Sequence, residues 1–304
     1  MSKTPITVII PTRDEELNIE LCLRSVSWAD QVMVVDSHSK DRTGEIAERF
    51  GAELYQFDYT GGWPKKKNWV LEHLPIRNEW VFFLDADERI PGDLQDEIAQ
   101  VVTGKGTVDG YWVRFRVYFL GRWIKHTSLY PTWILRLFRK EKGRFEKISV
   151  AAGSGDVELH ENVILDGQQG YLKHDLIHED LKPLQAFIER HNRYSTWEAE
   201  ADYQSEATSK TRASLLGTPP ERRRWMKRLF VRLPLRPLIK FSWIYLFRLG
   251  FLDGISGLIF SFLMAQHEVN ISIKRYEKRA MTRRLKLLNQ LNHPEEGKLR
   301  RSSR

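Results

Sequence analysis

Four short runs rich in apolar residues lie within residues 6–84 and are separated by stretches with helical spacing. The runs are Ile6–Pro11, Gln31–Val35, Glu53–Phe57 and Trp80–Leu84. Short apolar runs are typical of strands covered on both faces. Helices are expected between them at Glu15–Val26, Asp41–Phe50 and Lys65–His73. Strands that alternate with helices imply right-handed crossovers, so we predict a Rossmann-like α/β fold with a mostly parallel sheet and flanking helices.

After residue 100 the pattern changes to longer elements. Gly110–Leu120 and Thr132–Phe138 are rich in aromatic residues and valine, which favours strands. Leu181–Glu206 has the spacing of an amphipathic helix. A chain of 304 residues has room for about two structural units. We predict an α/β domain at 1–208, a linker at 209–220, an amphipathic helical region at 221–292 and a flexible tail at 293–304.

Composition excludes several classes of protein. With 41% hydrophobic and 29% charged residues, the chain is neither intrinsically disordered nor a polytopic membrane protein. Its single cysteine, Cys22, excludes intramolecular disulfides and cysteine-rich zinc sites and favours a reducing compartment. The first residues carry only a short apolar run before a charge cluster, so we expect no secretory signal.

Charge is unevenly distributed along the chain. Residues 217–304 hold 20 Lys and Arg against 6 Asp and Glu, a balance of +14, whereas residues 1–216 have a balance of −6. A basic tail of this kind indicates a polyanionic partner, either nucleic acid or an anionic lipid surface. Apolar residues interleave with the basic ones from Arg222 to Leu249, which is more apolar surface than phosphate contacts need. We therefore expect peripheral binding to an anionic membrane and no nucleic-acid binding.

Two features of the tail limit how it meets a membrane. Pro234 and Pro237 divide it into at least two helical pieces. The uncharged run Gly254–His267 has 14 residues, whereas a spanning helix needs about 20. Its length therefore predicts a buried or re-entrant segment. The same apolar surface is also compatible with a core or an oligomer interface.

Polar clusters follow three of the predicted strands. They are Thr12–Glu15, Asp36–Ser39 and Asp85–Glu88. In an open α/β sheet, ligands bind outside the carboxyl ends of the strands. Three acids within four positions repel one another unless a cation compensates, and carboxylates beside substrate phosphates commonly hold Mg²⁺ or Mn²⁺. The alternative is a solvated loop that caps a helix.

Phosphate-binding glycine motifs are missing from the sequence. No G-x-G-x-x-G follows the first strand and no G-x-x-x-x-G-K-[ST] occurs, which argues against a dinucleotide dehydrogenase and a P-loop NTPase. Phosphates in this protein are then neutralised by a metal ion and by side chains such as Lys67 or Arg136.

Several segments together resemble a known family. ITVIIPTRDEELNI, VVDSHSKDRT, KKKNWVLE and WVFFLDADE are similar to family 2 glycosyltransferases of the GT-A fold. RLFRKEKGRF, HNRYST and GFLDGISG are similar to the bacterial lipopolysaccharide core β-1,4-glucosyltransferase group. The resemblance implies an inverting transfer from a nucleotide-diphosphate sugar, specifically a UDP-sugar, with Mn²⁺ or Mg²⁺. The implied acceptor is a lipopolysaccharide-core or lipid-linked glycan at the inner face of the membrane.

The resemblance also implies roles for individual residues. Those matched to the donor site are Pro11, Thr12, Arg13, Glu15, Asp36, Lys67 and Asp85, with Arg136 added by the charge argument. Asp36 matches the acid that binds the base or ribose. Asp85 and Asp87 match the metal motif, with Asp87 as the direct ligand. His178 matches a histidine that completes the metal or phosphate site.

The catalytic base must be a carboxylate on the face opposite the leaving diphosphate. The resemblance points to the His160-Glu161 pair, and we assign the base to Glu161. Ala151–Asp156 appears as extra residues before this pair, which leaves Glu179 and Asp180 as substitutes. Two other functions stay open: a sugar nucleotidyltransferase, and a non-enzymatic membrane adaptor with a degenerate transferase body.

Overall fold

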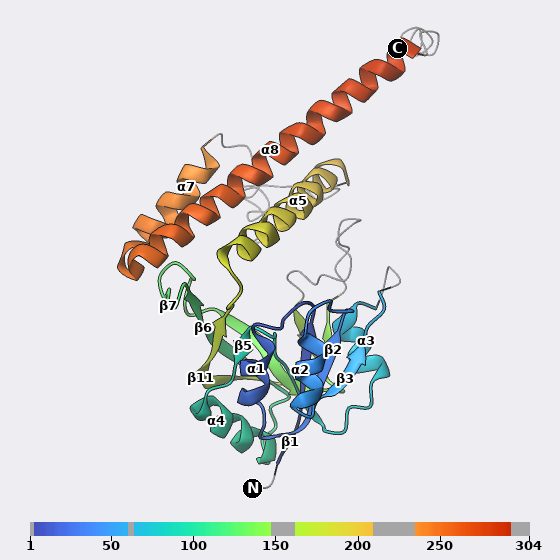
Figure 1. The fold of residues 1–304 in the computed structure, drawn as a ribbon, viewed down its shortest axis with the longest axis vertical. Helices are drawn as coiled ribbons and strands as arrows, with labels where there is room; N and C mark the ends of the chain where they lie inside the picture. Colours follow the sequence, from blue (N-terminus) through green and yellow to red (C-terminus); the bar gives the residue numbers. More distant parts are fainter. Residues whose placement is uncertain (1–2, 60–63, 147–161, 209–234, 293–304) are drawn as a thin grey trace. The chain divides into compact units, whose positions relative to one another are not determined.

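The computed structural model describes residues 3–59, 64–146, 162–208 and 235–292 (Figure 1). Within the described residues, the chain divides into two compact units. The first comprises residues 1–184 and 244–260, and the second comprises residues 185–243 and 261–304. The predicted linker and tail lie outside the described residues, as do His160, Glu161 and the Ala151–Asp156 segment.

A nine-stranded mixed sheet forms the first unit, with the order β3-β2-β1-β4-β8-β6-β11-β5 and β7 beside β6. Its parallel half consists of β1 (Thr4–Thr12), β2 (Ala29–Asp36), β3 (Glu53–Gln56) and β4 (Trp80–Phe83). These are the four predicted strands, and the predicted α/β fold class is confirmed.

The other half of the sheet contains both strand directions. Its strands are β5 (Glu88–Arg89), β6 (Gly110–Phe119), β7 (Arg122–Trp123), β8 (Trp133–Arg139) and β11 (Gln169–Glu179). Strand β8 is antiparallel to β4 and β6, whereas β11 is parallel to β6 and antiparallel to β5. A separate pair, β9 (Gly143–Phe145) and β10 (Val163–Leu165), is antiparallel. Strands β6 and β8 were expected, but β11 was not.

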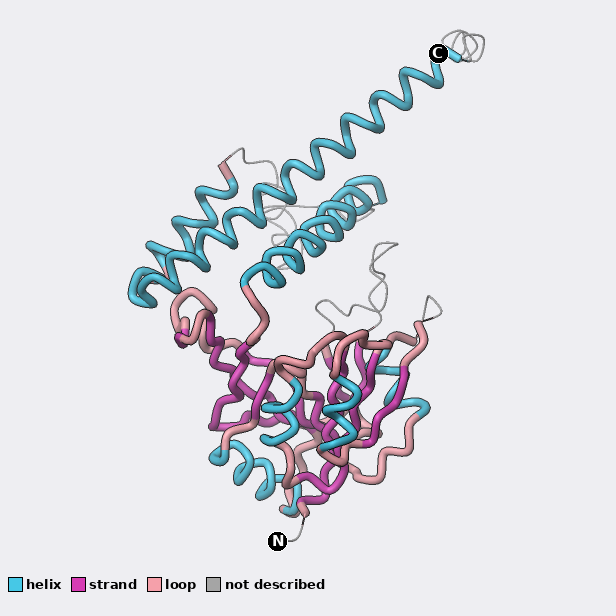
Figure 2. The backbone as a smooth tube through the Cα atoms, in the orientation of Figure 1, coloured by secondary structure: helices cyan, strands magenta, loops and turns pink. Residues whose placement is uncertain are grey.

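Helices cover both faces of the sheet (Figure 2). They are α1 (Ile19–Ser25), α2 (Thr43–Arg49), α3 (Lys66–His73) and α4 (Gly92–Thr103). Apolar side chains of α1, α2 and α4 join one core cluster with alternate residues of β1, such as Val8 and Ile10. Val70 of α3 joins a second cluster with Ile9 and Met33. Because successive side chains of a strand point to opposite faces, β1 contributes to both cores.

The second unit is helical. It contains α5 (Leu184–Thr208), α7 (Arg236–Ser242) and most of α8 (Gly254–Asn292). Buried Arg236 pairs with Glu268, with 2.5 Å between Nη2 and Oε2. The Lys274 Nζ donates to the carbonyl oxygen of Asn192 over 2.6 Å, which joins α8 to α5. The predicted run Gly254–His267 forms the first turns of α8, so it is not a separate short segment.

A bend precedes α8. It consists of a π-helical turn, η1 (Trp243–Phe247), and a 3₁₀ turn, η2 (Gly250–Asp253). Among the described helices, none alone has the length and apolar composition to cross a membrane. Arg236–Phe247 and Gly250–Leu285 meet these requirements only as a pair, and they are bent by 73°.

The core of the sheet gives a first test of the fold. Phe82, on the central strand β4, is fully buried, so Phe82→Ala is expected to lower the free energy of unfolding by about 3–5 kcal/mol. The exposed Ile164 serves as the control, since Ile164→Ala is expected to change it by less than about 0.5 kcal/mol. Urea denaturation followed by circular dichroism measures both, and equal effects would contradict the assigned core.

Candidate active site

A cavity of about 430 Å³ lies at the carboxyl end of β4. Its charged lining comes from Lys67 on α3, Asp85 after β4 and Arg136 on β8. Aromatic rings also line it: Trp112, Phe115, Trp133 and Phe145. Because ligands of open α/β sheets bind outside the carboxyl ends of the strands, this cavity is the candidate active site.

The Arg136 guanidinium lies between two carboxylates at this strand end. Its Nη2 is 2.5 Å from Asp85 Oδ2 and 2.8 Å from Glu88 Oε1. The Asp85 backbone N–H donates to Glu88 Oε2 over 2.9 Å. Burial alone would raise the pKa of Asp85, but the positive charges of Arg136 and Lys67 hold it well below its usual range. Asp85 is therefore ionised at neutral pH.

Asp87 is surrounded by other carboxylates, so negative charge predominates around its side chain. Burial raises the pKa of its carboxyl, and the neighbouring acids Asp85 and Glu88 add to the rise. His178 opposes it, with Nδ1 3.8 Å from Asp87 Oδ1 and 3.7 Å from Glu88 Oε1. Burial would lower the pKa of the His178 imidazole, but these carboxylates raise it to about 9. His178 is therefore a cation at neutral pH.

Asp36, at the end of β2, fixes the loop that follows β1. Its Oδ1 accepts hydrogen bonds from Thr12 Oγ1 over 2.8 Å and from Ser39 Oγ over 2.5 Å. Its Oδ2 accepts one from the Ser39 N–H over 2.7 Å. Ser39 Oγ in turn accepts from the N–H of Asp14, whose φ is 53°. Asp36 is buried, and these hydrogen bonds hold the loops after β1 and β2 together. Its contact with a base or ribose stays a prediction.

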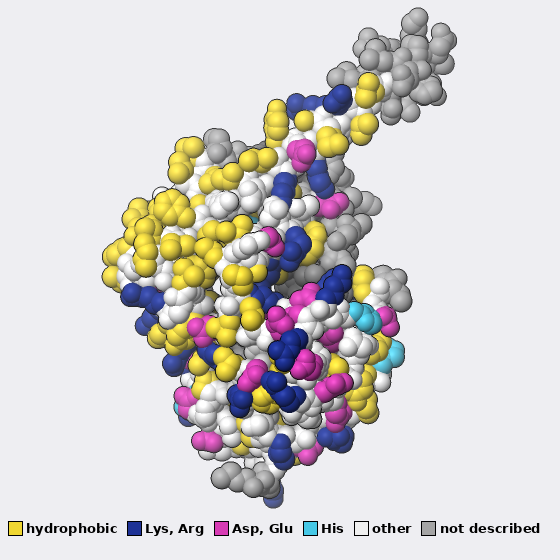
Figure 3. Space-filling model, viewed as in Figure 1, with side chains coloured by type: hydrophobic (Ala, Val, Ile, Leu, Met, Phe, Trp, Pro, Cys, Tyr) yellow, Lys and Arg dark blue, Asp and Glu magenta, His cyan; other side chains and the backbone are white. Residues whose placement is uncertain are grey.

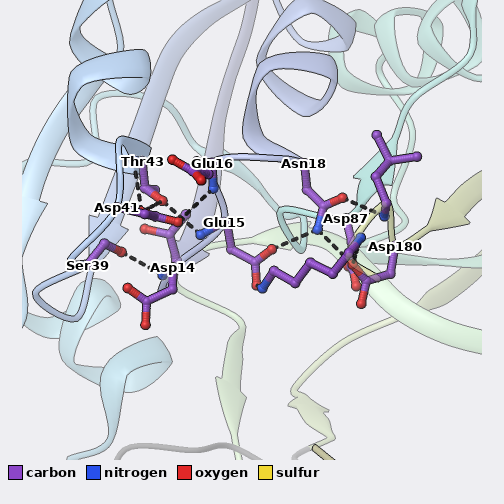
Figure 4. Close-up of polar contacts among 12 residues, drawn as sticks. Asp14, Glu15, Glu16, Asn18, Ser39, Asp41, Thr43, Asp87 and Asp180 are labelled. Carbon is purple, nitrogen blue, oxygen red and sulfur yellow. Dashed lines mark hydrogen bonds and ion pairs between the residues drawn. The ribbon is translucent and has the colours of Figure 1, made fainter. Parts of the chain in front are cut away.

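A second network joins the start of α1 to the end of β11 (Figure 4). Lys182 Nζ donates to Glu15 Oε1 over 2.6 Å, and Asn18 Nδ2 donates to Glu15 Oε2 over 2.8 Å. Asn18 Nδ2 also donates to Asp180 Oδ1 over 2.9 Å. Burial raises the pKa of Glu15 despite these partners, and the charge of Asp87 adds to the rise. The figure shows Asp180 beside Asp87, so this network borders the acidic cluster.

The structure brings part of the predicted donor site together. Lys67, Asp85 and Arg136 share the cavity lining, whereas Thr12 and Asp36 contact each other in the neighbouring loops. In the same β1 exit, Pro11 is half-buried and Arg13 is exposed, and Glu15 belongs to the second network. The roles of all these residues toward a donor stay predictions.

Of the three candidate bases, two already have protein partners. Glu179 forms an ion pair with Arg89, and Asp180 accepts from Asn18 and from the Lys182 N–H. Glu161 lies outside the described residues. Its assignment as the base stays a prediction.

The acidic cluster fits a divalent cation in part. The described residues contain no group of three or more His, Cys, Asp or Glu side chains spaced to hold a metal ion. Mg²⁺ is nevertheless usually held by one or two carboxylates together with substrate phosphates, and Asp85 and Asp87 supply such oxygens. The negative charge around Asp87 also favours a cation. His178 lies next to these acids, with Nδ1 3.8 Å from Asp87 Oδ1, and its part in a metal or phosphate site stays a prediction.

Sequence reasoning missed several residues of the site. Buried Lys66 donates from Nζ to the carbonyl oxygen of Thr12 over 3.0 Å and so supports the loop after β1. The aromatic lining, including Trp112 and Trp133, also went unassigned. The sequence signal for them was the high content of aromatic residues in β6 and β8. The same content is equally typical of strands that pack into a hydrophobic core.

A family comparison assigns the chain to a class. The model of glycosyl transferase family 2 matches residues 7–159, half of the chain. The protein therefore belongs to glycosyl transferase family 2, and the predicted family and enzyme class are confirmed.

The chain is also similar to individual known proteins. The chain is 25% identical over 297 residues to the lipopolysaccharide core biosynthesis glycosyltransferase LpsC of Rhizobium meliloti, covering 96% of this chain and 99% of LpsC. It is 37% identical over 97 residues to an uncharacterized glycosyltransferase of Rickettsia bellii, covering 32% of each chain. Among solved structures, it resembles the mannosyltransferase PcManGT of Pyrobaculum calidifontis in complex with GDP-Man and Mn²⁺, at 18% identity and a TM-score of 0.44, covering 91% and 88%.

Arg136 is the cation on which the acidic cluster depends. Arg136→Met removes the guanidinium that lies between Asp85 and the buried Glu88 and is expected to lower the free energy of unfolding by about 3–5 kcal/mol. Adding Glu88→Gln removes one of the two carboxylate charges and is expected to restore part of the loss. A double-mutant cycle from urea denaturation measures the coupling, and additive effects would show that the two side chains act independently.

Proposed function

We propose that this glycosyltransferase moves a sugar, with inversion at the anomeric carbon, from a UDP-sugar to a lipopolysaccharide-core or lipid-linked glycan. The proposal places it on the cytoplasmic side of the inner membrane as a peripheral protein. The single observation that carries the donor half is the set of charged groups at the end of β4. There, the carboxylate of Asp85 lines one cavity with the cations Lys67 and Arg136, and Asp87 belongs to the same acidic cluster.

The proposed donor site contains carboxylates for a metal ion and cationic side chains for the phosphates. Asp85 and Asp87 would hold a Mn²⁺ or Mg²⁺ ion, which supplies positive charge to the diphosphate when it is bound. Lys67 and His178 lie next to the same acids and would bind phosphate oxygens. Arg136 keeps Asp85 ionised, which suits a carboxylate that faces a metal ion. Thr12 and Asp36 set the shape of the loops beside the nucleotide.

The reaction is a displacement at the anomeric carbon. The acceptor hydroxyl oxygen forms a bond to this carbon while the bond to the diphosphate oxygen breaks. The hydroxyl proton passes to Glu161, and the electron pair of the broken bond stays on the diphosphate, where the cationic side chains stabilise it. Trp112 and Trp133 offer flat apolar surfaces against which sugar rings can pack.

Two observations support an acceptor at a membrane. The relative LpsC is named for lipopolysaccharide core biosynthesis and matches nearly the full length of this chain. The segment from residue 217 onward has a net charge of +14 in an apolar sequence, which suits an anionic lipid surface. These observations favour a glycan transferase over a nucleotidyltransferase or an adaptor.

Donor binding through the acidic cluster can be measured without an acceptor. In a thermal-shift screen of nucleotide-sugars, the native protein is expected to gain several degrees with a UDP-sugar plus Mn²⁺. Asp87→Asn is expected to lose the part of this gain that depends on Mn²⁺. The exposed Asp166→Asn is the matched control and is expected to behave as the native protein. An unchanged response in Asp87→Asn would contradict the metal assignment.

The base can be tested separately from donor binding. Glu161→Gln is expected to bind the UDP-sugar normally but to reduce transfer by about 10²–10⁴-fold. Transfer is measured as incorporation of labelled sugar into a lipid-linked glycan fraction from bacterial membranes. Glu179→Gln and Asp180→Asn provide the comparison, and a larger loss in either of them would move the base to that residue.

A further inference from the structure

Residues 244–260, here called the tip, expose large apolar side chains although they belong to the same unit as the sheet. Phe247 is 74% exposed and Ile255 is 68% exposed. Other exposed apolar residues of the tip are Leu246, Leu249, Phe251 and Leu252. Figure 3 shows hydrophobic side chains gathered where the chain turns from α7 into α8, with Lys and Arg side chains next to them. An apolar concentration of this kind marks an interaction surface.

The charges around the tip are almost all positive. The tip contains Arg248, and the adjoining segment 119–131 contributes the exposed Arg122 and Lys125. Asp253 is the only acid in these two stretches, and its side chain is only 3% exposed. A surface of exposed apolar and cationic side chains without exposed acids complements anionic lipid headgroups over an acyl layer.

Asp253 fastens the tip to segment 119–131. Its Oδ2 accepts from the Thr127 N–H over 2.8 Å and from Thr127 Oγ1 over 2.9 Å. The His126 N–H lies 3.0 Å from the same oxygen, and His126 Nδ1 lies 2.8 Å from Oδ1. The side chain of Arg122 adds a hydrogen bond to the carbonyl oxygen of Leu252. These groups hold the tip at a defined place on the first unit.

Glycines make this attachment possible. A Cβ at Gly250 would lie 2.7 Å from Thr127 Cγ2 and 2.7 Å from the carbonyl oxygen of Ile244. A Cβ at Gly257 would lie 2.3 Å from the carbonyl oxygen of Gly250. Gly254 has a φ of 67°, which side chains disfavour. The G-x-x-x-G-x-x-G spacing thus lets the bend close tightly and seat against Thr127.

A chain of contacts runs from the attachment to the cavity. Tyr130, at the end of the fastened segment, donates from Oη to Asp175 Oδ2 over 2.9 Å. Asp175 Oδ1 is 2.8 Å from Arg114 Nε, and the Arg114 guanidinium lies 5.1 Å from the ring centre of Trp133. Trp133 lines the cavity. The surface that carries the exposed apolar residues is therefore connected to one wall of the candidate active site.

We infer that the tip, together with segment 119–131, inserts into the headgroup region of an anionic bilayer, and that Asp253 holds this surface at a fixed position relative to the cavity. This inference rests on the membrane-linked acceptor of the proposed function. Asp253 acts as a positioning residue, because it touches neither the cavity lining nor the acidic cluster. A fixed attachment holds the cavity at a constant distance from the bilayer surface. At that distance the sugar of a lipid-anchored acceptor can enter the cavity.

Insertion can be followed with one label because the only native thiol, Cys22, is buried. The full-length variant Ile255→Cys carries an environment-sensitive fluorophore and is mixed with vesicles of equal parts phosphatidylcholine and phosphatidylglycerol. A blue shift and quenching by lipid-borne quenchers are expected. The label at Ile164→Cys, an exposed site on β10, is the control and is expected to stay in water.

Two results would overturn the insertion. One is a label at position 255 that does not respond to the vesicles, and the other is a blue shift without vesicles that grows with protein concentration, which would indicate a second copy of the chain. Leu246→Glu combined with Ile255→Glu is expected to weaken vesicle binding by at least about tenfold, since two apolar side chains no longer enter the lipid.

The role of Asp253 needs a structural readout. Nitroxide labels at positions 164 and 255 report the spread of distances between the sheet and the tip in vesicle-bound protein. Asp253→Asn places an amide among hydrogen-bond donors and is expected to broaden this distribution clearly, while Glu277→Gln, at an exposed acid of α8 outside the attachment, is expected to leave it narrow. Equal widths in native protein and Asp253→Asn would refute the positioning role.

Donor binding separates failure of this inference from failure of the proposed function. In the thermal-shift screen, Asp253→Asn is expected to keep the gain with a UDP-sugar and Mn²⁺. Native protein that gains stability with the donor while position 255 stays in water would keep the transferase and reject the inserted tip. Insertion without any nucleotide-sugar response would reject the proposed function.

Discussion

One buried guanidinium allows several acids to gather where β4 ends. Without a cation at this point, the buried carboxylate of Glu88 and the half-buried carboxylate of Asp85 could not lie close together, because desolvation and mutual repulsion would protonate them or push them apart. Arg136 reaches both acids from β8, the strand that also reverses the direction of the sheet. The change from parallel to antiparallel strands thus delivers the compensating charge to the place where a polyanionic ligand meets the protein.

The loops around this charge cluster are held by side chains and not by regular structure. Asp36 binds Thr12 and Ser39, while Lys182 and Asn18 connect the start of α1 with the segment after β11. Charged hydrogen bonds of this kind are short and directional, so they fix the loop backbones without filling the space a ligand needs. Rigid surroundings suit a reaction that stabilises charge on a leaving diphosphate, since prearranged groups need no reorganisation.

The sequence predicted the parallel half of the sheet well because β1, β2 and β4 are buried on both faces and consist of apolar runs. The helix expected to begin at Glu15 begins at Ile19, because Glu15 and Asn18 make tertiary contacts in the preceding turn. Strand β11 was missed because its residues are partly polar and exposed, and because the buried Asp175 has partners far away in the sequence, namely Arg114, Arg116 and Tyr130.

Pairings between distant residues were beyond the reach of sequence patterns. Arg136 was singled out as a phosphate-binding cation, yet its pairing with Glu88, 48 residues away, has no local signal. The contact of Asp253 with Thr127 spans 126 residues, and GFLDGISG appeared only as a segment shared with related proteins. Local spacing predicts which face of a helix or strand is apolar, but the partner of a buried charge is set by the tertiary fold.

The return of residues 244–260 to the sheet unit has a consequence for how the protein is made. During translation the N-terminal strands emerge first, and most of the sheet can form while the rest of the chain is still being synthesised. His126 and Thr127 lack their carboxylate partner until Asp253 has emerged from the ribosome, because Asp253 lies more than a hundred residues further along the chain. The first unit is thus completed only after residues 244–260 have been synthesised, and a chain terminated before them lacks this segment.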